Sequence, residues 1–520
     1  MAFPRVFGPL AGPIPTSYID DNFNALSAPT GTTNIGYQSS LAGAVPRTQA
    51  QINDETISVM RFGALGDGVT DDTAAFNLTH IAAALLNACV YMPGTVNGYK
   101  LAGTLALKAS MRGDGILTRL ITSSATLDVM QCGVKGVTLS DFQITTSVTR
   151  TAGYYINFNA DNSDCHVRNV RLTNYFDGIG LTGTVSAFWS LKGLVMQTTS
   201  VTGTAVRIST TGNSVALGME DVIIGAPAAS NTFGVSVLNC GDLTLRSVNT
   251  AQCGVGLQLI PPNGKTIQVV MVSDSLYDSG ASYGVLTDPA AGGTVQLLKM
   301  VNVWACTNTH GVLLNPSGTG LTQRVELINM TMSNNTSKGL YVNGATVTNV
   351  LALGGSAAAN VDGIFVVAPA DRITIANMKL GSNGQFGPNS GYGINLNAGV
   401  TTNISILGND LNGNTTGTIL DGSTGAGKLF RDNAGWGYGS NSSFDPPNLV
   451  AGAGATTTVT VTGAVVGDVA SASFSNDLQG ITLTAWVSAA NTVSSRFQNQ
   501  TAGALDLASG ALRNVIERRT

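Results

Sequence analysis

The sequence predicts an all-β protein: a solenoid of stacked β-strands, with a short capping helix at its start and a small antiparallel β-sandwich at its end. Three observations predict this fold class. A glycine followed by alternating apolar residues recurs about every 27 residues from Gly178 to Gly417, and that period is typical of a solenoid. A capped helical pattern directly precedes these repeats. After residue 446, alternating strands separated by Gly- and Asn-rich breaks take over.

The solenoid begins in residues 59–115, where a strand end passes into a helix and then back into strands. Sharp turns with positive φ are permitted there by three glycines: Gly63, Gly66 and Gly68. Asp71 or Asp72 can then cap a helix over about residues 71–87. Its apolar face should comprise Ala75, Phe76, Ile81, Ala84 and Leu85. His80 lies in this helix, and we expect it to have a packing role.

Four motifs stand in this stretch: Phe62-Gly63-Ala64, Gly66 to Ala75, Tyr91-Met92-Pro93-Gly94 and Arg112-Gly113-Asp114-Gly115. Together they resemble the opening of the pectate-lyase-like right-handed parallel β-helix of bacteriophage tailspikes. The resemblance implies a right-handed, single-stranded parallel β-helix whose first rung is plugged by the helix. It also implies a trimeric virion protein that binds, and often cleaves, a bacterial surface polysaccharide.

Composition narrows the classes of partner. Charged residues make up 11% of the 520 residues and the net charge is −4, so the basic stripes of nucleic-acid binders are missing. A surface rich in Ser, Thr and Asn suits a hydroxyl-rich ligand. No run approaches the roughly 18 apolar residues of a membrane span, so we expect no membrane insertion. Met1 to Arg5 lacks the apolar core of a signal peptide.

The six cysteines have no paired spacing and mostly stand within apolar strands, so we expect small buried hydrophobic residues. This pattern fits assembly in the reducing host cytoplasm. Acidic residues are scattered, and no cluster at loop spacing suggests a calcium site. We therefore expect no metal and no cofactor.

The chain divides into three predicted domains: residues 1–55, 56–446 and 447–520. The first contains a short predicted helix from Ser17 to Leu26 and resembles the N-termini of tail proteins. That resemblance implies a virion anchor docked to phage tail or baseplate proteins, and the alternative is a flap packed on its own solenoid. The last, with strands expected at 457–461 and 481–487, resembles the C-terminal β-domain of tailspikes, which implies a role in trimerisation.

A second pattern runs in phase with the repeat glycines. A small polar residue interrupts alternating strands at Asn169, Asp221, Ser247, Asn302, Asn329 and Asn377. Asn and Asp tolerate the left-handed conformation, and stacked Asn side chains can bond along a ladder, so Asp221 should be structural. Alternation places Met219 and Val222 inside and Glu220 outside. We expect outer ion pairs in the column of Arg168, Lys192, Glu220 and Arg246, and between Lys299 and Glu326.

One column of residues directly precedes successive repeat glycines: Tyr283, His310, Lys338, Asp362 and Tyr392. Such corner positions are commonly polar, so a solvated structural edge is the first interpretation. The functional interpretation is a saccharide groove in which Tyr283 and Tyr392 bind sugar faces, while His310, Lys338 and Asp362 are catalytic. Further candidates for substrate binding are Glu220, Asp274 and Asp278.

The sequence thus predicts a homotrimeric receptor-binding protein of the phage tail that recognises a bacterial capsule, O-antigen or exopolysaccharide. An outward apolar stripe of Leu286, Leu313 and Phe365 favours side-by-side packing of three chains. Depolymerisation could proceed by hydrolysis with two carboxyls or by β-elimination with a base and a cation, and His310 with Lys338 suits elimination. The alternative is a non-enzymatic adhesin or structural tail fibre on the same scaffold.

Overall fold

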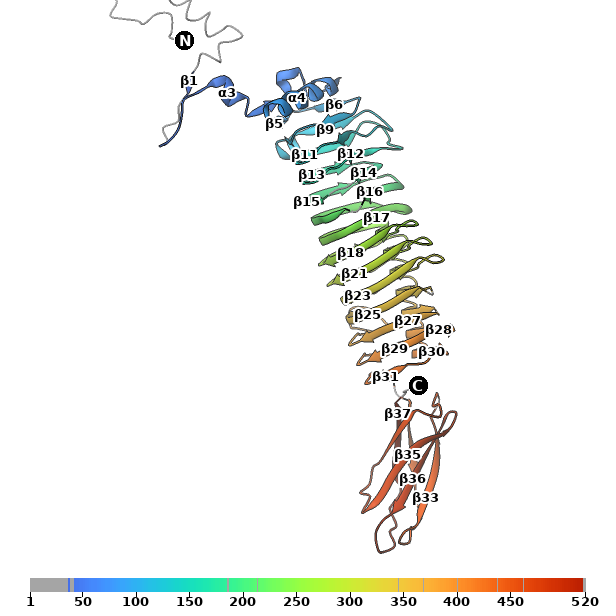
Figure 1. Ribbon diagram of the computed structural model, residues 1–520. Coiled ribbons are helices and arrows are strands. Elements are labelled where there is room, and N and C mark those ends of the chain that lie inside the picture. Colours follow the sequence, from blue (N-terminus) through green and yellow to red (C-terminus); the bar gives the residue numbers. More distant parts are fainter. Residues whose placement is uncertain are drawn as a thin grey trace, which may run out of the picture. The chain divides into compact units, whose positions relative to one another are not determined.

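The computed structural model describes residues 36–37 and 42–517, apart from gaps at 185–186, 213, 345, 368, 400, 437 and 462. The chain divides into two compact units, residues 1–195 and 196–520. Parallel strands form a β-solenoid, and antiparallel sheets follow near the C-terminus, so the predicted fold class is confirmed (Figure 1). The predicted helix from Ser17 to Leu26 lies outside the described residues. The boundaries at 55/56 and 446/447 remain predictions.

Unit 1 contains the first strands of the solenoid and its capping helix, and its last strand runs two residues past the boundary at residue 195. In parallel pairing, β3 joins β5, β5 joins β8, and β8 joins β11. Its elements are β1 (Gly36–Tyr37), β2 (Arg47–Thr48), α3 (Gln49–Asn53), β3 (Thr56–Ser58), η1 (Val59–Phe62), β4 (Asp67–Asp71), α4 (Thr73–Leu86), β5 (Cys89–Tyr91), β6 (Gly98–Leu101), β7 (Leu105–Leu107), β8 (Met111–Arg112), η2 (Gly115–Leu117), β9 (Arg119–Thr122), β10 (Met130–Cys132), β11 (Thr138–Thr146), β12 (Tyr154–Phe158), β13 (His166–Thr173), β14 (Asp177–Leu181) and β15 (Ala187–Gln197).

Helix α4 begins and ends close to where the sequence predicts. The three turn glycines have positive φ, and the left-handed C-cap is Asn87 with a φ of 51°. Asp71 accepts a hydrogen bond from the backbone N–H of Thr73 at 3.1 Å. The Asp72 carboxylate instead accepts from the backbone of Leu65 and Gly66, at 2.7 and 3.2 Å. Asp71 therefore bonds the first N–H of the helix from the position before the N-cap, and Asp72, the N-cap residue itself, closes the preceding turn.

The predicted inner face of α4 was wrong in part. Ala75 and Phe76 are buried, but Ile81, Ala84 and Leu85 are exposed. The inner face consists of Ala75, Phe76, Thr79, His80 and Ala83, which confirms the packing role of His80. Because α4 is apolar on most of its surface, periodicity alone did not fix its rotation. In the structure Asn77 fixes the rotation of the helix, since its side chain bonds to the backbone of Thr104 and Ala106.

Unit 2 stacks two series of parallel strands. The glycine-led sheet consists of β20, β22, β24, β26, β28 and β30, and the long-strand sheet of β18, β21, β23, β25, β27, β29 and β31. Figure 1 shows these strands following one another down the picture in sequence order, from β18 to β31. Their bounds are β16 (Thr202–Ser209), β17 (Val215–Leu259), β18 (Thr266–Ser273), β19 (Leu276–Asp278), β20 (Tyr283–Thr287), β21 (Thr294–Val301), β22 (His310–Leu314), β23 (Leu321–Thr331), β24 (Lys338–Asn343), β25 (Val347–Ser356), β26 (Asp362–Val367), β27 (Ala370–Ala376), β28 (Tyr392–Gly399), β29 (Thr401–Leu407), β30 (Gly417–Ser423) and β31 (Leu429–Arg431).

The repeat positions require glycine because neighbouring rungs approach each other closely there. A Cβ on Gly284 would lie 2.7 Å from the carbonyl oxygen of Gly311, and one on Gly311 would lie 2.7 Å from that of Gly339. The same crowding continues to Gly363 and Gly393. Backbone atoms of the next rung fill the space of a side chain, so no other residue fits without displacing a rung.

The predicted left-handed turns are confirmed. The six small polar residues have φ between 51° and 55°, including Asp221 at 54°. Their side chains bond between rungs: Asn329 donates to Asn302 at 2.8 Å, and Asn302 donates to Asp274 at 3.2 Å. This outer ladder makes Asp274 part of a turn column.

A second asparagine ladder, which the sequence interpretation missed, lies inside the solenoid. Asn308, Asn335, Asn360 and Asn389 are at most 4% exposed. The backbone N–H of Asn308 donates to the side chain of Asn335, and that pattern repeats from Asn335 to Asn360 and from Asn360 to Asn389 at 2.9–3.0 Å. Each asparagine precedes a repeat glycine by three or four residues, and this spacing was the available signal.

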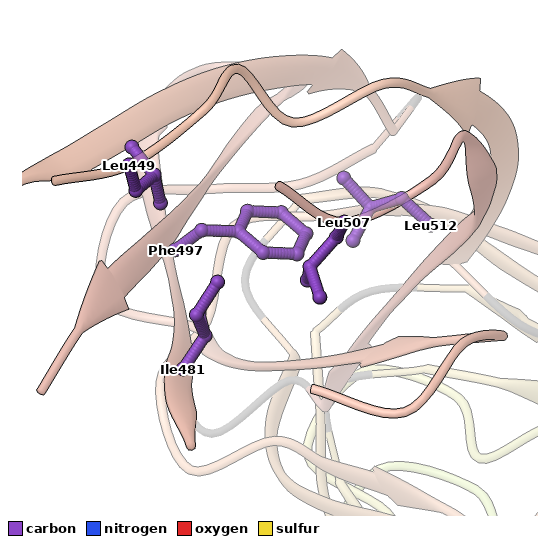
Figure 2. Close-up of a cluster of buried hydrophobic side chains, with 5 residues drawn as sticks. All are labelled: Leu449, Ile481, Phe497, Leu507 and Leu512. Atoms are coloured by element: carbon purple, nitrogen blue, oxygen red, sulfur yellow. The ribbon is translucent and has the colours of Figure 1, made fainter. Parts of the chain in front are cut away.

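The C-terminal residues form two three-stranded antiparallel sheets, in the orders β32-β37-β34 and β33-β36-β35. Side chains from both sheets meet in one cluster, with Phe497 at its centre (Figure 2). The two strands expected at 457–461 and 481–487 correspond to β33 and β35. The bounds are β32 (Tyr438–Phe444), β33 (Gly454–Thr460), β34 (Val469–Phe474), β35 (Ile481–Ala489), β36 (Thr492–Asn499) and β37 (Gly510–Glu517).

Two further sequence expectations concern cysteines and the membrane. The six cysteines are free, five are buried and Cys89 is half-buried, which confirms their packing role. Within the described part of the chain, no helix has the length and apolar character needed to cross a membrane.

Replacing Asn335 by Ala should lower the free energy of unfolding by about 2–4 kcal/mol, since each buried group left without a partner costs about 1–3 kcal/mol. The Asn308 N–H and the Ala305 carbonyl would both lose a bond. Asn329→Gly is the matched control, because glycine keeps the left-handed turn of the exposed ladder. Chemical denaturation measures both, and equal effects would contradict a special role for the buried ladder.

Candidate functional site

The predicted column of five residues is aligned as expected. Tyr283 of β20 stands opposite His310 of β22, His310 opposite Lys338 of β24, and Lys338 opposite Asp362 of β26. Tyr392 of β28 is joined to the column by its backbone N–H, which donates to Asp362 at 2.9 Å. The register follows from the repeat glycines, which pack rung against rung immediately after each column residue.

Aromatic rings cover one part of this column. The Tyr283 ring is stacked on the His310 ring, with centroids 5.7 Å apart and planes inclined by 7°. His310 meets Tyr341 at 5.2 Å, and Tyr341 meets Phe365 at 5.3 Å, both edge to face. Tyr283, His310, Tyr341 and Phe365, all half-buried, are called the aromatic strip below. It presents ring edges and faces from four consecutive rungs.

An ion pair of Lys338 and Asp362 adjoins the aromatic strip. The Lys338 ammonium bonds to the Asp362 carboxylate and lies 4.5 Å from the centre of the Phe365 ring. Their side chains are only 15% and 4% exposed. Asp362 also accepts from the Tyr392 backbone at 2.9 Å and from the Asn395 amide at 3.3 Å. The carboxylate is thus fully bonded and poorly placed to protonate a ligand.

The His310 imidazole is held neutral by its surroundings. Burial, and then the nearby Lys338 charge, lower the pKa of His310 to about 4 from its usual 6.5. Its Nδ1 atom is buried and has no hydrogen-bond partner among the described residues. At neutral pH the resting imidazole is therefore a proton acceptor, and it can donate that proton only after it has accepted one during a reaction.

The predicted exposed apolar stripe was wrong for two of its three members. Leu286 and Leu313 are 8% and 5% exposed, because aromatic neighbours fold over them. They form a cluster with Val255, packed against Phe233, Tyr283 and Tyr341. This stripe therefore gives no support for contacts between chains.

The other predicted acids belong to other strands and turns than the aromatic strip. Glu220 stands 3.7 Å from Arg246, and Lys299 stands 3.0 Å from Glu326, which confirms both predicted ion pairs. Met219 and Val222 point inward, as expected. Asp274 belongs to the outer turn ladder.

Asp278 accepts from the backbone N–H of Ser279 at 2.9 Å, next to the fully buried Tyr277. It belongs to β19 and therefore lies outside the column. Across the described residues, no group of three or more His, Cys, Asp and Glu side chains is placed to hold a metal ion.

The site contains residues that the sequence interpretation did not assign to it. Tyr341 and Asn395 stand second after the repeat glycines Gly339 and Gly393, the position that Phe365 has after Gly363. Alternation places this position outward, so the same rule that found Phe365 would have found both.

Comparisons with known proteins identify the fold. No protein-family model and no curated protein matches the chain. A tailspike protein variant of E. coli bacteriophage HK620 in complex with a hexasaccharide matches with a TM-score of 0.60 and 11% identity, over 96% of this chain and 100% of that chain. A second variant, in complex with a pentasaccharide, gives 0.58 and 11%, with the same coverage. At this identity the likeness concerns the fold alone.

Lys338→Met should destabilise the protein by about 3–5 kcal/mol, because it leaves the Asp362 charge buried without a counter-ion. Adding Asp362→Asn should restore most of this loss, since the amide oxygen can still accept from the Tyr392 backbone. Thermal and chemical unfolding of the parent, the single variant and the double variant measure the effect. A single variant as stable as the parent would show that the pair is not needed for stability.

Proposed function

We propose that this chain is a phage tailspike of the pectate-lyase-like class, a receptor-binding protein of the virion tail that recognises a bacterial surface polysaccharide. The observation that carries the proposal is the aromatic strip next to the Lys338–Asp362 pair, on a solenoid with the fold of the HK620 tailspikes. Those proteins are described in complex with a hexasaccharide and a pentasaccharide.

The aromatic strip suits a saccharide for physical reasons. The C–H face of a sugar ring is apolar and packs on aromatic rings, whereas its hydroxyls need polar partners at the edge. Tyr283 and Tyr341 offer ring surface, and Tyr392 is placed further along the same column. Asn395 and Lys338 supply donors beside them. A chain of several sugars can follow the stacked rungs, which repeat about every 4.8 Å.

We propose that this site also depolymerises its polysaccharide by β-elimination. Hydrolysis needs two carboxyls with suitable freedom, and Asp362 is held by Lys338, Tyr392 and Asn395. Neutral His310 can remove the proton next to a uronate carboxyl, while Lys338 balances the charge of that carboxyl. The C–H electrons form the new C=C bond, the glycosidic C–O bond breaks, and the departing oxygen takes the proton from the imidazolium.

A second candidate function is a non-enzymatic adhesin on the same scaffold. It is favoured by the Lys338–Asp362 pair, in which the cation is already neutralised and nearly buried. In that case the column binds sugar without changing it.

We further propose a homotrimer, assembled in the host cytoplasm, whose residues 1–55 dock to phage tail or baseplate proteins and whose residues 447–520 aid trimerisation. Support comes from apolar side chains that single chains leave exposed. In unit 1, Leu78, Ile81 and Leu85 of α4 are 52%, 47% and 79% exposed. Apolar surface of this kind is commonly covered by another subunit.

His310→Gln should lower turnover roughly 10²–10⁴-fold, the range for a lost general base. Tyr283→Ala should mainly weaken binding, because it removes ring surface. Parent turnover should fall as pH drops through about 4, where His310 becomes protonated. Ultraviolet absorbance of the unsaturated uronate product measures turnover, with Arg513→Ala on β37 as an exposed control.

Three results would redirect this proposal. New reducing ends without ultraviolet absorbance would indicate hydrolysis. Binding without any product would indicate the adhesin. Full activity of the His310 variant on a substrate that the parent digests would place the chemistry elsewhere, with Glu220, Asp274 and Asp278 the next residues to substitute.

Light scattering should give a mass of three times the 53.2 kDa chain for the full protein. Deleting residues 1–55 should keep this mass and the polysaccharide binding but abolish incorporation into virions, because β3 and α4 retain the first rung. A single-chain mass at micromolar concentration would contradict the trimer, and loss of the thermal transition on deletion would make the segment part of the core.

A further inference from the structure

A groove lies on the outer face of the long-strand sheet, on a different sheet from the aromatic strip. Its volume is about 390 Å³, at the small end of the roughly 300–1,000 Å³ usual for ligand pockets. Its lining residues come from β23, β25, β27 and β29: Arg324, Glu326, Asn349, Val350, Leu351, Arg372, Thr374 and Asn403.

The groove arises from an alternation of long and short side chains along one column. The strand registers place Asn349 opposite Arg324, Arg372 opposite Asn349, and Asn403 opposite Arg372. The two arginines are therefore two rungs apart, or about 10 Å between backbones. Asn349 is too short to fill the space between them, so an open notch remains above Leu351 and Thr374.

The backbone at this column makes the two arginines unusual. All four residues are left-handed: Arg324 has a φ of 50°, Asn349 of 56°, Arg372 of 55° and Asn403 of 55°. Asparagine adopts this conformation readily, whereas a bulky side chain pays a steric penalty in it, and such residues concentrate at functional sites. Asparagine would serve the turn at all four positions. The arginines therefore need a reason other than folding.

The charges around the notch leave one cation unpaired. Lys299 pairs with Glu326 at 3.0 Å, and Arg372 pairs with Asp371 at 3.1 Å. The Arg324 guanidinium is exposed and has no ion-pair partner within the described residues. On a surface with so few charges, this excess favours an anionic ligand.

We infer that this notch is a separate saccharide subsite, which takes an acidic sugar by its carboxylate. The inference rests on the proposed function and deepens it, because it adds a second, separate contact to an acidic sugar of the same polysaccharide. The planar guanidinium of Arg324 matches a carboxylate with two parallel N–H bonds, and Arg372 holds the opposite edge. Leu351 supports the apolar face of the ring, while Thr374 and Asn349 can bond to its hydroxyls.

The inference is tested by measuring how the full-length protein binds three fluorescently labelled probes. These are tri-galacturonate, its methyl ester, and a trisaccharide of uncharged sugars that carries a sulfate group in place of the carboxylate. The parent should bind tri-galacturonate at least tenfold more tightly than the ester. Arg324→Asn and Arg372→Asn should each weaken binding roughly 10–100-fold, the effect of losing a charged hydrogen bond. Arg324→Lys should weaken binding less than Arg324→Asn, because lysine keeps the positive charge but lacks the two parallel N–H groups of the guanidinium.

The asparagine variants carry their own folding control. Because asparagine suits the left-handed column, Arg324→Asn should have an unchanged or higher melting temperature. Arg513→Asn on β37 is the matched control for a lost surface charge, and it should bind tri-galacturonate like the parent. Fluorescence polarisation at two salt concentrations should show weaker parent binding at higher salt.

The possible outcomes separate the two proposals. Equal binding of the acid and its ester, or parent-like binding by Arg324→Asn, would overturn the notch as a carboxylate subsite. Equal binding of the sulfated sugar would overturn the carboxylate assignment as well. If the parent binds neutral bacterial polysaccharides and Tyr283→Ala weakens that binding, the proposed function stands even though this inference fails. A parent that binds no polysaccharide would overturn the proposed function itself.

Discussion

The register of the parallel ladders is the constraint on which the rest of this structure depends. Each rung lies about 4.8 Å from the next, so whatever occupies one position must be compatible with the same position above and below. From Gly284 to Gly363 the carbonyl of the next rung lies 2.5–2.7 Å from where a Cβ would stand. A single shift of register would place side chains there and move every inward residue outward. The glycines therefore fix the columns, and the columns determine which side chains can act together.

The same constraint has different consequences for the hydrogen bonds of polar groups inside and outside the solenoid. The polar groups of a buried asparagine all need hydrogen-bond partners. In the inner ladder the backbone N–H of each asparagine donates to the side-chain oxygen of the asparagine on the next rung. The outer ladder has water as an alternative partner, so its bonds contribute less and its residues can vary. The four left-handed positions of β23, β25, β27 and β29 are of this outer type. At such outer positions the chain can replace asparagine by arginine without leaving a buried group unbonded.

Much of this architecture could be predicted from residue spacing, because spacing reports register. The recurring glycines give the period, the small polar residues predict the six left-handed turns, and alternation within the repeat predicts the pairs Glu220–Arg246 and Lys299–Glu326. Alternation does not show whether neighbouring side chains cover a residue that points outward. Leu286 and Leu313 point out of the strand yet are buried, because Tyr283 and Tyr341 fold over them. The rotation of α4 was missed for a similar reason, since a helix apolar on most sides has no single preferred face.

The candidate site shows what a column position can and cannot reveal. Sequence placed His310, Lys338 and Asp362 side by side, and the structure keeps them so. The sequence alone could not show that burial lowers the pKa of His310 to about 4, or that Lys338 and Asp362 neutralise each other. Both effects come from packing in three dimensions. A charge that is buried and already paired, such as that of Lys338, stabilises the scaffold as well as facing any ligand, whereas an exposed charge without a partner among the described residues, such as that of Arg324, is wholly available to a ligand. Pairing, more than proximity, is therefore the better guide to which charges of a solenoid face contribute to binding.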